Sequence, residues 1–171
     1  MKIALGADHG GFVLKGEIEH FLNGRGYETV DYGTHSIESC DYPLFAYKVA
    51  KAVSDKLADA GVLICKSGNG MAMVANKFPG VRAAICFDTN VAVLSRQHNN
   101  ANILVLGSEH LLDDPEQIVK SWLEAGFEGG RHQRRVKQIA AIEGKIQGKR
   151  LKVKGKSLPA GRQGRKRRGI K

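Results

Sequence analysis

Five short runs of apolar residues, separated by longer amphipathic segments, most constrain the fold of this chain. The runs cover residues 2–7, 27–32, 61–65, 82–86 and 102–106, and each is bounded by Gly, Asp or Asn. Most of them are nearly continuous rather than alternating, a pattern typical of parallel strands that are covered on both faces. The sequence therefore predicts an α/β fold, a doubly wound sandwich around a parallel sheet.

The segments between these runs have the periodicity of amphipathic helices. Apolar residues recur at helical spacing over residues 14–22 and again over 45–57. Residues 114–117 combine an N-cap Asp, a Pro in the first helical position and a capping-box Gln, so a helix should begin there. A last helix is expected from about residue 131 to residue 143. The alternation of strands and helices is that of a single doubly wound domain.

The positive charge of the chain is concentrated at one end. Residues 145–171 carry 12 of the 27 Lys and Arg and none of the 17 Asp and Glu, which leaves residues 1–144 with 15 basic and 17 acidic residues. This end lacks hydrophobic periodicity, so we expect one folded domain over residues 1–145 and a basic, disordered tail over residues 146–171. Nucleic acid is expected as a partner only through this tail, by phosphate contacts. A solvated tail with no binding role is the alternative.

Cysteine usage and hydropathy favour a cytoplasmic protein. The three cysteines, Cys40, Cys65 and Cys86, follow no disulfide or zinc spacing motif. No run approaches the roughly 18 apolar residues of a membrane span, and the first residues lack the pattern of a signal peptide. We therefore expect a cytoplasmic location, no membrane contact and no metal site.

Polar residues able to do chemistry follow the predicted strands. In an open parallel sheet, ligands bind beyond the carboxyl ends of the strands. The first strand is followed by Asp8 and His9, and the third by the loop Cys65–Gly70, whose glycines allow several backbone N–H groups to face one anion. Lys66 and the adjoining helix start are expected to lower the pKa of the Cys65 thiol and make it a usable base. A buried core cysteine is the alternative, as is an Asp8 that only caps its own turn.

Two arginines form a candidate phosphate site. Arg131 and Arg135 lie four residues apart at the start of the last predicted helix, so they project to one side and could clamp a phosphate. A solvated basic helix face is the alternative. His98, in the segment before the last strand, is a further candidate, with a structural helix-end histidine as its alternative. Met71 occupies the Arg position of a C-x5-R phosphatase loop, and the first strand–helix turn lacks G-x-G-x-x-G, so both of those phosphate-binding sites are excluded.

Five groups of residues occur in the order and spacing of one known family. They are Gly6–Lys15, Asp41–Pro43, Ala75–Ala83, Leu94–Asn99 and Glu128–Val136. Together they resemble the ribose-5-phosphate isomerase type B family, which includes the lactose-pathway galactose-6-phosphate isomerase subunits and the allose-6-phosphate isomerases. The resemblance covers residues 1 to about 145. It implies a Rossmann-like three-layer sandwich with a five-stranded parallel sheet, and a homodimer or dimer of dimers whose active sites are shared between subunits.

The resemblance also implies a reaction and its residues. It implies an aldose–ketose isomerase that interconverts ribose 5-phosphate and ribulose 5-phosphate through a cis-enediolate, with no metal and no organic cofactor. Cys65 matches the family's proton-abstracting base, and His98 matches the residue that opens the furanose ring. Matched positions that contact the sugar-phosphate substrate or form the anion hole are Asp8, His9, Ser67, Gly68, Gly70, Asn99, Arg131 and Arg135. Lys66 and Asn69, in the same loop, are expected to contact the substrate as well.

Two positions depart from the usual pattern of the family. Lys66 stands where a glycine is common, and Glu109 stands where many members have a phosphate-contacting arginine. Two alternative functions therefore stay open. One is an isomerase of a six-carbon sugar phosphate such as allose or galactose 6-phosphate, and the other is a non-catalytic phosphosugar-binding protein with an RNA-binding tail.

Overall fold

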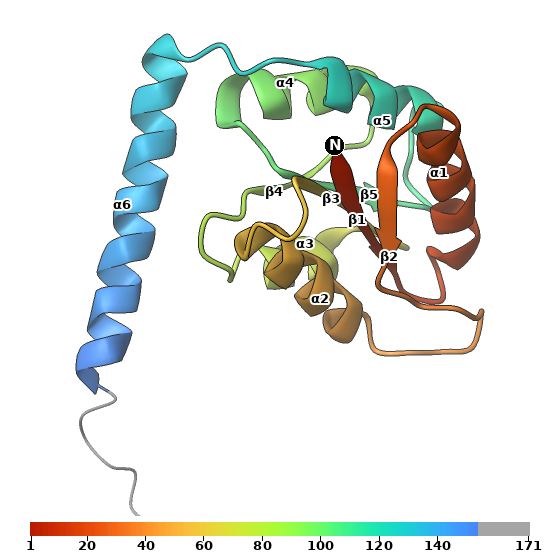
Figure 1. Cartoon of the computed structure of the whole chain (residues 1–171), viewed down its shortest axis with the longest axis horizontal. Helices are drawn as coiled ribbons and strands as arrows, with labels where there is room; N and C mark the ends of the chain where they lie inside the picture. Colours follow the sequence, from red (N-terminus) through yellow and green to blue (C-terminus); the bar gives the residue numbers. More distant parts are fainter. Residues whose placement is uncertain (154–171) are drawn as a thin grey trace, which may run out of the picture.

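Five parallel strands form one sheet at the centre of the molecule (Figure 1). The computed structural model describes residues 1–153 of the chain. The strands are β1 (Lys2–Ala7), β2 (Glu28–Asp31), β3 (Ala60–Cys65), β4 (Ala83–Ile85) and β5 (Ile103–Gly107). They are ordered β2-β1-β3-β5-β4, and each neighbouring pair is parallel. The predicted α/β class and its five-stranded parallel sheet are confirmed.

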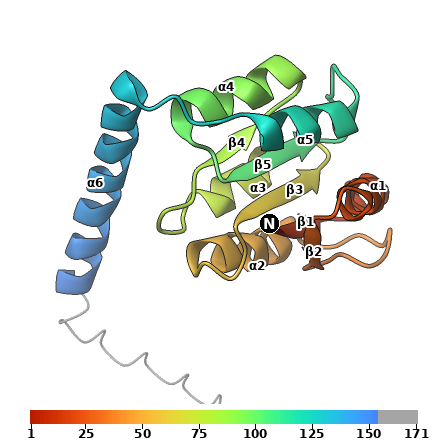
Figure 2. The ribbon, with the colours of Figure 1, turned by 45° about the horizontal axis from the view of Figure 1, so that its top comes forward.

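Helices cover both faces of this sheet, which makes the predicted three layers (Figure 2). One face carries α1 (Phe12–Gly24), α4 (Thr89–Asn99) and α5 (Pro115–Glu124), and the other carries α2 (Tyr42–Ser54) and α3 (Asn69–Ala75). Successive side chains of a strand point to opposite faces. Leu5 therefore packs against the first group of helices while Ala4 packs against the second. Because both faces are covered, the strands are apolar throughout, as their sequences indicated.

The strand order reverses its direction between β1 and β3. From β1 the chain moves outward to β2 and then returns, so that β3 lies on the other side of β1. The connections after β1 and β3 therefore cover opposite faces of the sheet, and the carboxyl ends of two such strands are where ligands bind in open parallel sheets. Asp8 follows β1 directly, and Lys66 follows β3 directly. The fold thus brings the two loops singled out in the sequence to one place.

The last helix, α6 (Gly130–Val153), stands to one side of the sandwich and contacts it mainly at α4 (Figures 1 and 2). It is longer than the helix predicted over residues 131–143 and continues past the domain boundary predicted at residue 145. That boundary stays a prediction, and residues 154–171, which make up most of the predicted basic tail, lie outside the described residues. Among residues 1–153, no helix is both long enough and apolar enough to cross a membrane.

Candidate active site

The loops that follow β1, β3 and β5 are joined by hydrogen bonds into one rim. The Ser108 backbone N–H donates to the carbonyl of Cys65 at 2.9 Å, and the Ser108 hydroxyl donates to the carbonyl of Gly10 at 2.9 Å. The Glu109 N–H donates to the carbonyl of Lys66 at 3.1 Å. These bonds hold the three loops at fixed separations, so side chains on them can act on one ligand.

Cys65 lies at the base of this rim and is 5% exposed. Its Sγ accepts a hydrogen bond from the backbone N–H of Gly68 at 3.1 Å. Gly68 has a φ of 78°, a left-handed conformation that glycine adopts without strain, and this turn aims its N–H back at the sulfur. A loop that donates to the sulfur stabilises the thiolate, which is the form able to take a proton.

The pKa of Cys65 differs from the sequence prediction. Burial raises the pKa of its thiol, the backbone N–H groups of Gly68, Ser67 and Met71 oppose that effect, and the charge of Asp8 adds to it. The net direction is upward, so the predicted lowering is wrong. The ammonium of Lys66, which was expected to lower the pKa, lies instead 3.3 Å from the carboxylate of Glu109. The thiolate of Cys65 is therefore a stronger base than the thiolate of a free cysteine, but it forms at a higher pH.

Asp8 and His9 occupy the turn after β1. One carboxylate oxygen of Asp8 accepts from the backbone N–H of Gly10 at 2.9 Å and of Gly11 at 3.2 Å, so this residue caps its own turn. The Nδ1 atom of His9 accepts from the backbone N–H of Cys40 at 3.3 Å. A neutral His9 therefore carries its proton on Nε2, where it can donate to a ligand.

Tyr42, at the start of α2, was not among the predicted site residues. A Cβ placed on Gly70 would lie 2.4 Å from the Tyr42 ring, so this aromatic side chain packs directly on the backbone of the Cys65–Gly70 loop. A side chain at this position would have to displace the Tyr42 ring. Within the same loop, the Asn69 N–H donates to the Ser67 hydroxyl at 3.4 Å. The motif Asp41–Pro43 was the available signal for Tyr42, but it was used only for the resemblance.

His98 and Asn99 lie at the opposite edge of the sheet. They end α4, and β5 begins at Ile103, so they stand at the amino edge of β5, whereas Cys65 stands at the carboxyl edge of β3. The five residues of β5, at about 3.3 Å each, separate the two edges by about 16 Å. The structure therefore does not bring Cys65 and His98 together within one chain.

Arg131 joins the half of the site that contains His98. It lies in the first turn of α6, and its Nε–H donates to the Nε2 atom of His132 at 3.2 Å. The His132 ring is stacked on the His98 ring with centroids 4.2 Å apart. Arg135, one turn further along, is exposed. The predicted residues thus form two groups, one around Cys65 and one around His98.

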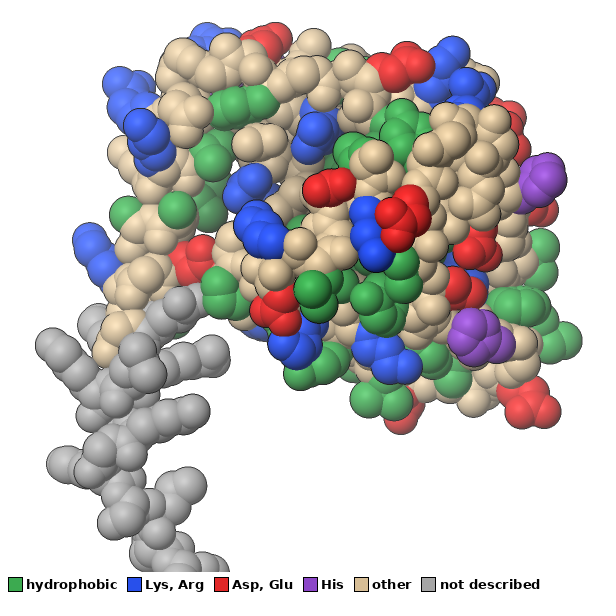
Figure 3. Space-filling model, in the orientation of Figure 1, with side chains coloured by type: hydrophobic (Ala, Val, Ile, Leu, Met, Phe, Trp, Pro, Cys, Tyr) green, Lys and Arg blue, Asp and Glu red, His purple; other side chains and the backbone are tan. Residues whose placement is uncertain are grey.

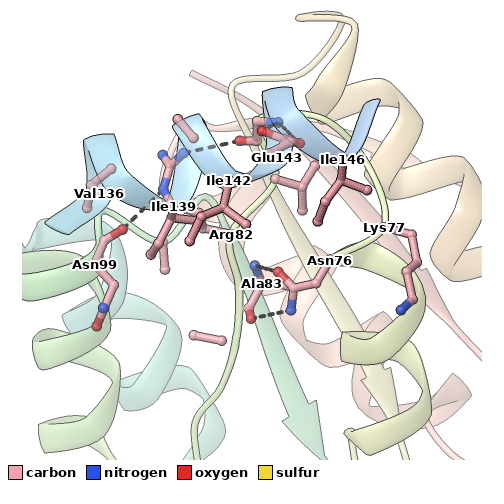
Figure 4. Close-up of a pocket in the computed structure, with 15 residues that line it drawn as sticks. Asn76, Lys77, Arg82, Ala83, Asn99, Val136, Ile139, Ile142, Glu143 and Ile146 are labelled. Atoms are coloured by element: carbon pink, nitrogen blue, oxygen red, sulfur yellow. Dashed lines mark hydrogen bonds between the residues drawn. The ribbon is translucent and has the colours of Figure 1, made fainter. Parts of the chain in front are cut away.

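A groove of about 570 Å³ lies between α6 and the β4 side of the sandwich, next to Asn99. Hydrophobic side chains on the inner side of α6 border this hollow (Figure 3). Ile139 and Ile142 point from α6 toward Arg82, and Glu143 accepts hydrogen bonds from the Gly80 N–H at 3.0 Å and 3.1 Å (Figure 4). The isoleucines of this face remain 48–57% exposed, which is a large apolar surface to leave in water.

The family of the chain follows from its sequence match. The family model described as Ribose/Galactose Isomerase matches residues 3–139, which includes both groups of candidate residues. The chain belongs to this Ribose/Galactose Isomerase family. Ribose-5-phosphate isomerase B of Escherichia coli (strain K12) is 51% identical over 143 residues, which cover 83% of this chain and 96% of that protein.

Solved structures of this isomerase family have the same fold. A ribose-5-phosphate isomerase B from Clostridium thermocellum superposes with a TM-score of 0.83 at 52% identity, covering 85% of this chain and 99% of that one. A ribose-5-phosphate isomerase B from Mycoplasma genitalium with bound ribulose-5-phosphate gives a TM-score of 0.80 at 42% identity, covering 83% of this chain and 95% of that one. The predicted resemblance and the Rossmann-like architecture are confirmed.

Proposed function

We propose that this protein interconverts ribose 5-phosphate and ribulose 5-phosphate, with Cys65 as the base. The observation that carries this proposal is the position of Cys65: a nearly buried thiol at the switch point of the sheet, with the Gly68 N–H 3.1 Å from its sulfur. Family membership and the relative with bound ribulose-5-phosphate support the substrate. We include Lys66 and Asn69 among the residues that contact this substrate.

The isomerisation moves one proton between neighbouring carbons. The Cys65 thiolate takes the proton from C2 of the open-chain aldose, the electron pair passes to the carbonyl oxygen at C1, and a cis-enediolate forms. Return of the proton from the Cys65 thiol to C1, together with transfer of the O2 proton to O1, completes the ketose. In this proposal, backbone N–H groups of the loop Ser67–Gly70 stabilise the enediolate oxygens. The thiol is restored at the end of each turnover.

Ring opening must come before proton transfer because ribose 5-phosphate is mostly a closed furanose. We assign His98 as the acid that gives a proton to the ring oxygen while the C1–O4 bond breaks and the aldehyde forms. The proton of the anomeric hydroxyl passes to solvent water. Imidazole suits this role because its ordinary pKa lies close to neutrality. Asp8, His9, Asn99, Arg131 and Arg135 complete the proposed contacts to the sugar and its phosphate.

We further propose that two copies of the chain share each active site. Cys65 and His98 stand at opposite edges of the sheet, so one chain alone cannot apply both to one substrate. A second copy supplies the missing half and also covers the apolar face of α6 beside Asn99. A symmetric dimer of this kind forms two complete sites.

Mixing two inactive variants tests both proposals. Cys65→Ala and His98→Ala are each expected to lower kcat for ribose 5-phosphate by about 10²–10⁴-fold. After the two variants are unfolded and refolded together, half of the dimers are mixed, and each mixed dimer contains one intact site. Activity should then return to about a quarter of that of the parent. No recovery, with mixed dimers confirmed by native mass spectrometry, would contradict the shared site.

The assay also separates the alternative substrates. The values of kcat/KM for ribose 5-phosphate, allose 6-phosphate and galactose 6-phosphate are compared in the presence of EDTA. The parent protein and Cys65→Ala are both measured. We expect ribose 5-phosphate to have the highest kcat/KM. A higher value for a six-carbon substrate would transfer the same mechanism to that sugar. Absence of turnover with all of them would favour a phosphosugar-binding protein.

A further inference from the structure

His98 does not stand alone at the end of α4. Its imidazole is stacked on that of His132 with an interplanar angle of 3° and a centroid distance of 4.2 Å. The carboxylate oxygen Oε2 of Glu128 lies 3.9 Å from His98 Nε2 and 3.6 Å from His132 Nε2, so it faces the same edge of both rings. Neither Glu128 nor His132 was assigned a role by the sequence analysis.

His132 is fixed more firmly than the residue that it supports. It is 5% exposed, and its Nε2 accepts from Arg131 Nε–H. Nε2 therefore carries a lone pair rather than a proton, and the ring is neutral. Burial lowers the pKa of His132, and the charges of His98, Arg131 and Arg135 act in the same direction, against the attraction of Glu128. A neutral ring can stay stacked on His98 whether or not His98 is protonated, whereas two protonated rings would repel each other.

The arrangement suits stacking rather than metal binding. The nitrogen and oxygen atoms of His98, Glu128 and His132 lie within 4.8 Å of one another, as ligands of one ion would. The lone pairs of imidazole lie in the ring plane, and these two planes are parallel, so the lone pairs do not converge on one point. The lone pair of His132 Nε2 is in addition used by Arg131.

We infer that His132 and Glu128 are positioning residues for the ring-opening acid His98. His132 holds the plane of the His98 ring, and the Glu128 carboxylate, 3.9 Å from His98 Nε2, attracts this nitrogen when it carries a proton. Arg131 keeps His132 in the neutral form that allows the stack. The backbone supports the same geometry, because the Glu128 N–H donates to the carbonyl of Gln97 at 3.1 Å and so ties this segment to the end of α4.

This inference rests on the proposed function, and the two steps of the proposed reaction provide a way to test it. Ribulose 5-phosphate cannot close to a furanose, because its O5 is esterified. In D₂O, exchange of its C1 proton therefore requires proton abstraction by Cys65 but no ring opening. Isomerisation of ribose 5-phosphate requires both steps. A residue that acts through His98 affects the second measurement and spares the first.

The experiment compares His132→Ala, His132→Phe and Glu128→Gln with His98→Ala and Cys65→Ala. We expect His132→Ala to lower kcat for ribose 5-phosphate by about 10- to 100-fold, as small misplacements of a reacting group do, and to change deuterium exchange by less than about twofold. Phe retains a stacked ring, so kcat of His132→Phe should lie between those of the parent and His132→Ala. Glu128→Gln, like His132→Ala, should lower kcat for ribose 5-phosphate and spare deuterium exchange. His20→Ala, an exposed histidine on α1, is the matched control.

Each outcome has one meaning. Loss of both reactions in His132→Ala, or of neither, would overturn the positioning role, with the dimer checked by light scattering in every variant. The positioning role would also be overturned if His98→Ala lost isomerisation but kept deuterium exchange while His132→Ala did not. The assignment of His98 as the ring-opening acid would then still stand. If the parent protein catalyses neither exchange nor isomerisation, the proposed function itself fails. If Cys65→Ala retains exchange, the assignment of the base fails.

Discussion

Lys66 and Glu109 form an ion pair on the rim of loops that holds Cys65. The ammonium lies 3.3 Å from the carboxylate, and both side chains are more than half exposed. The Lys66 stem crosses the backbone of Gly10, where a Cβ would lie 2.5 Å from the Lys66 Cγ. The carboxylate of Glu109 is therefore paired with the ammonium of Lys66 instead of standing alone beside the loop that holds Cys65.

This ion pair predicts opposite effects of its two single substitutions. Lys66→Met leaves an unpaired carboxylate near the bound phosphate, so KM for ribose 5-phosphate should rise by about 3- to 10-fold. Glu109→Gln frees the ammonium, so KM should fall by a similar factor, and the double variant should lie near the parent. Steady-state kinetics at low ionic strength measures all three. Glu28→Gln, which breaks the Lys2–Glu28 pair at the other edge of the sheet, should leave KM unchanged.

The raised pKa of Cys65 predicts how the reaction depends on pH. The base must be deprotonated, so kcat/KM should increase as the pH rises and should still be increasing at about pH 8.5, the ordinary pKa of a thiol. Because the charge of Asp8 contributes to the upward shift, Asp8→Asn should move the rising limb toward lower pH. The measurement is the pH profile of kcat/KM between pH 6 and pH 10. A plateau reached near neutrality would contradict the burial argument.

The ion pair of Lys15 and Asp31 predicts a loss of stability. Lys15 projects from α1, its side chain is 3% exposed, and its ammonium contacts Asp31 at the end of β2. Asp31→Asn keeps an oxygen for the Gly33 N–H but removes the charge, leaving a buried ammonium without its counterion. The free energy of unfolding should fall by about 3 kcal/mol in urea titrations. The double variant Asp31→Asn with Lys15→Met should regain most of the lost free energy of unfolding. Asp55→Asn, which breaks the exposed ion pair with Lys51, should change the free energy of unfolding little.

The apolar face of α6 predicts a substitution that separates the subunits. Ile142 lines the groove beside the sandwich and is 57% exposed in a single chain. Ile142→Glu places a charge on the face that we expect a second copy to cover, so the protein should become monomeric and lose isomerase activity. Lys137→Glu alters the same helix outside this groove and should leave the oligomeric state and the isomerase activity unchanged. Light scattering and the isomerase assay measure the outcome, and a fully active monomer would contradict the shared site.

The sequence analysis predicted most of the fold because the signals were local. Continuous apolar runs such as Gly61–Cys65 indicated buried parallel strands, and all five lie within a few residues of the observed strands. The capping pattern at Asp114 predicted the start of α5, where its carboxylate accepts from the N–H groups of Glu116 and Gln117. The length of α6 was underestimated, because few apolar residues mark the turns after Glu143.

The parallel sheet, the polar loops at its strand ends and membership of an isomerase family could all be predicted from the amino-acid sequence. These depend on the order of residue types along the chain, which the sequence contains completely. The contacts between side chains became known only from the folded structure: Lys66 pairs with Glu109, His98 stacks on His132, and Cys65 lies apart from His98. Burial, the direction of the Cys65 pKa shift and the distance between two edges of a sheet arise from packing between distant segments, and no local pattern encodes them.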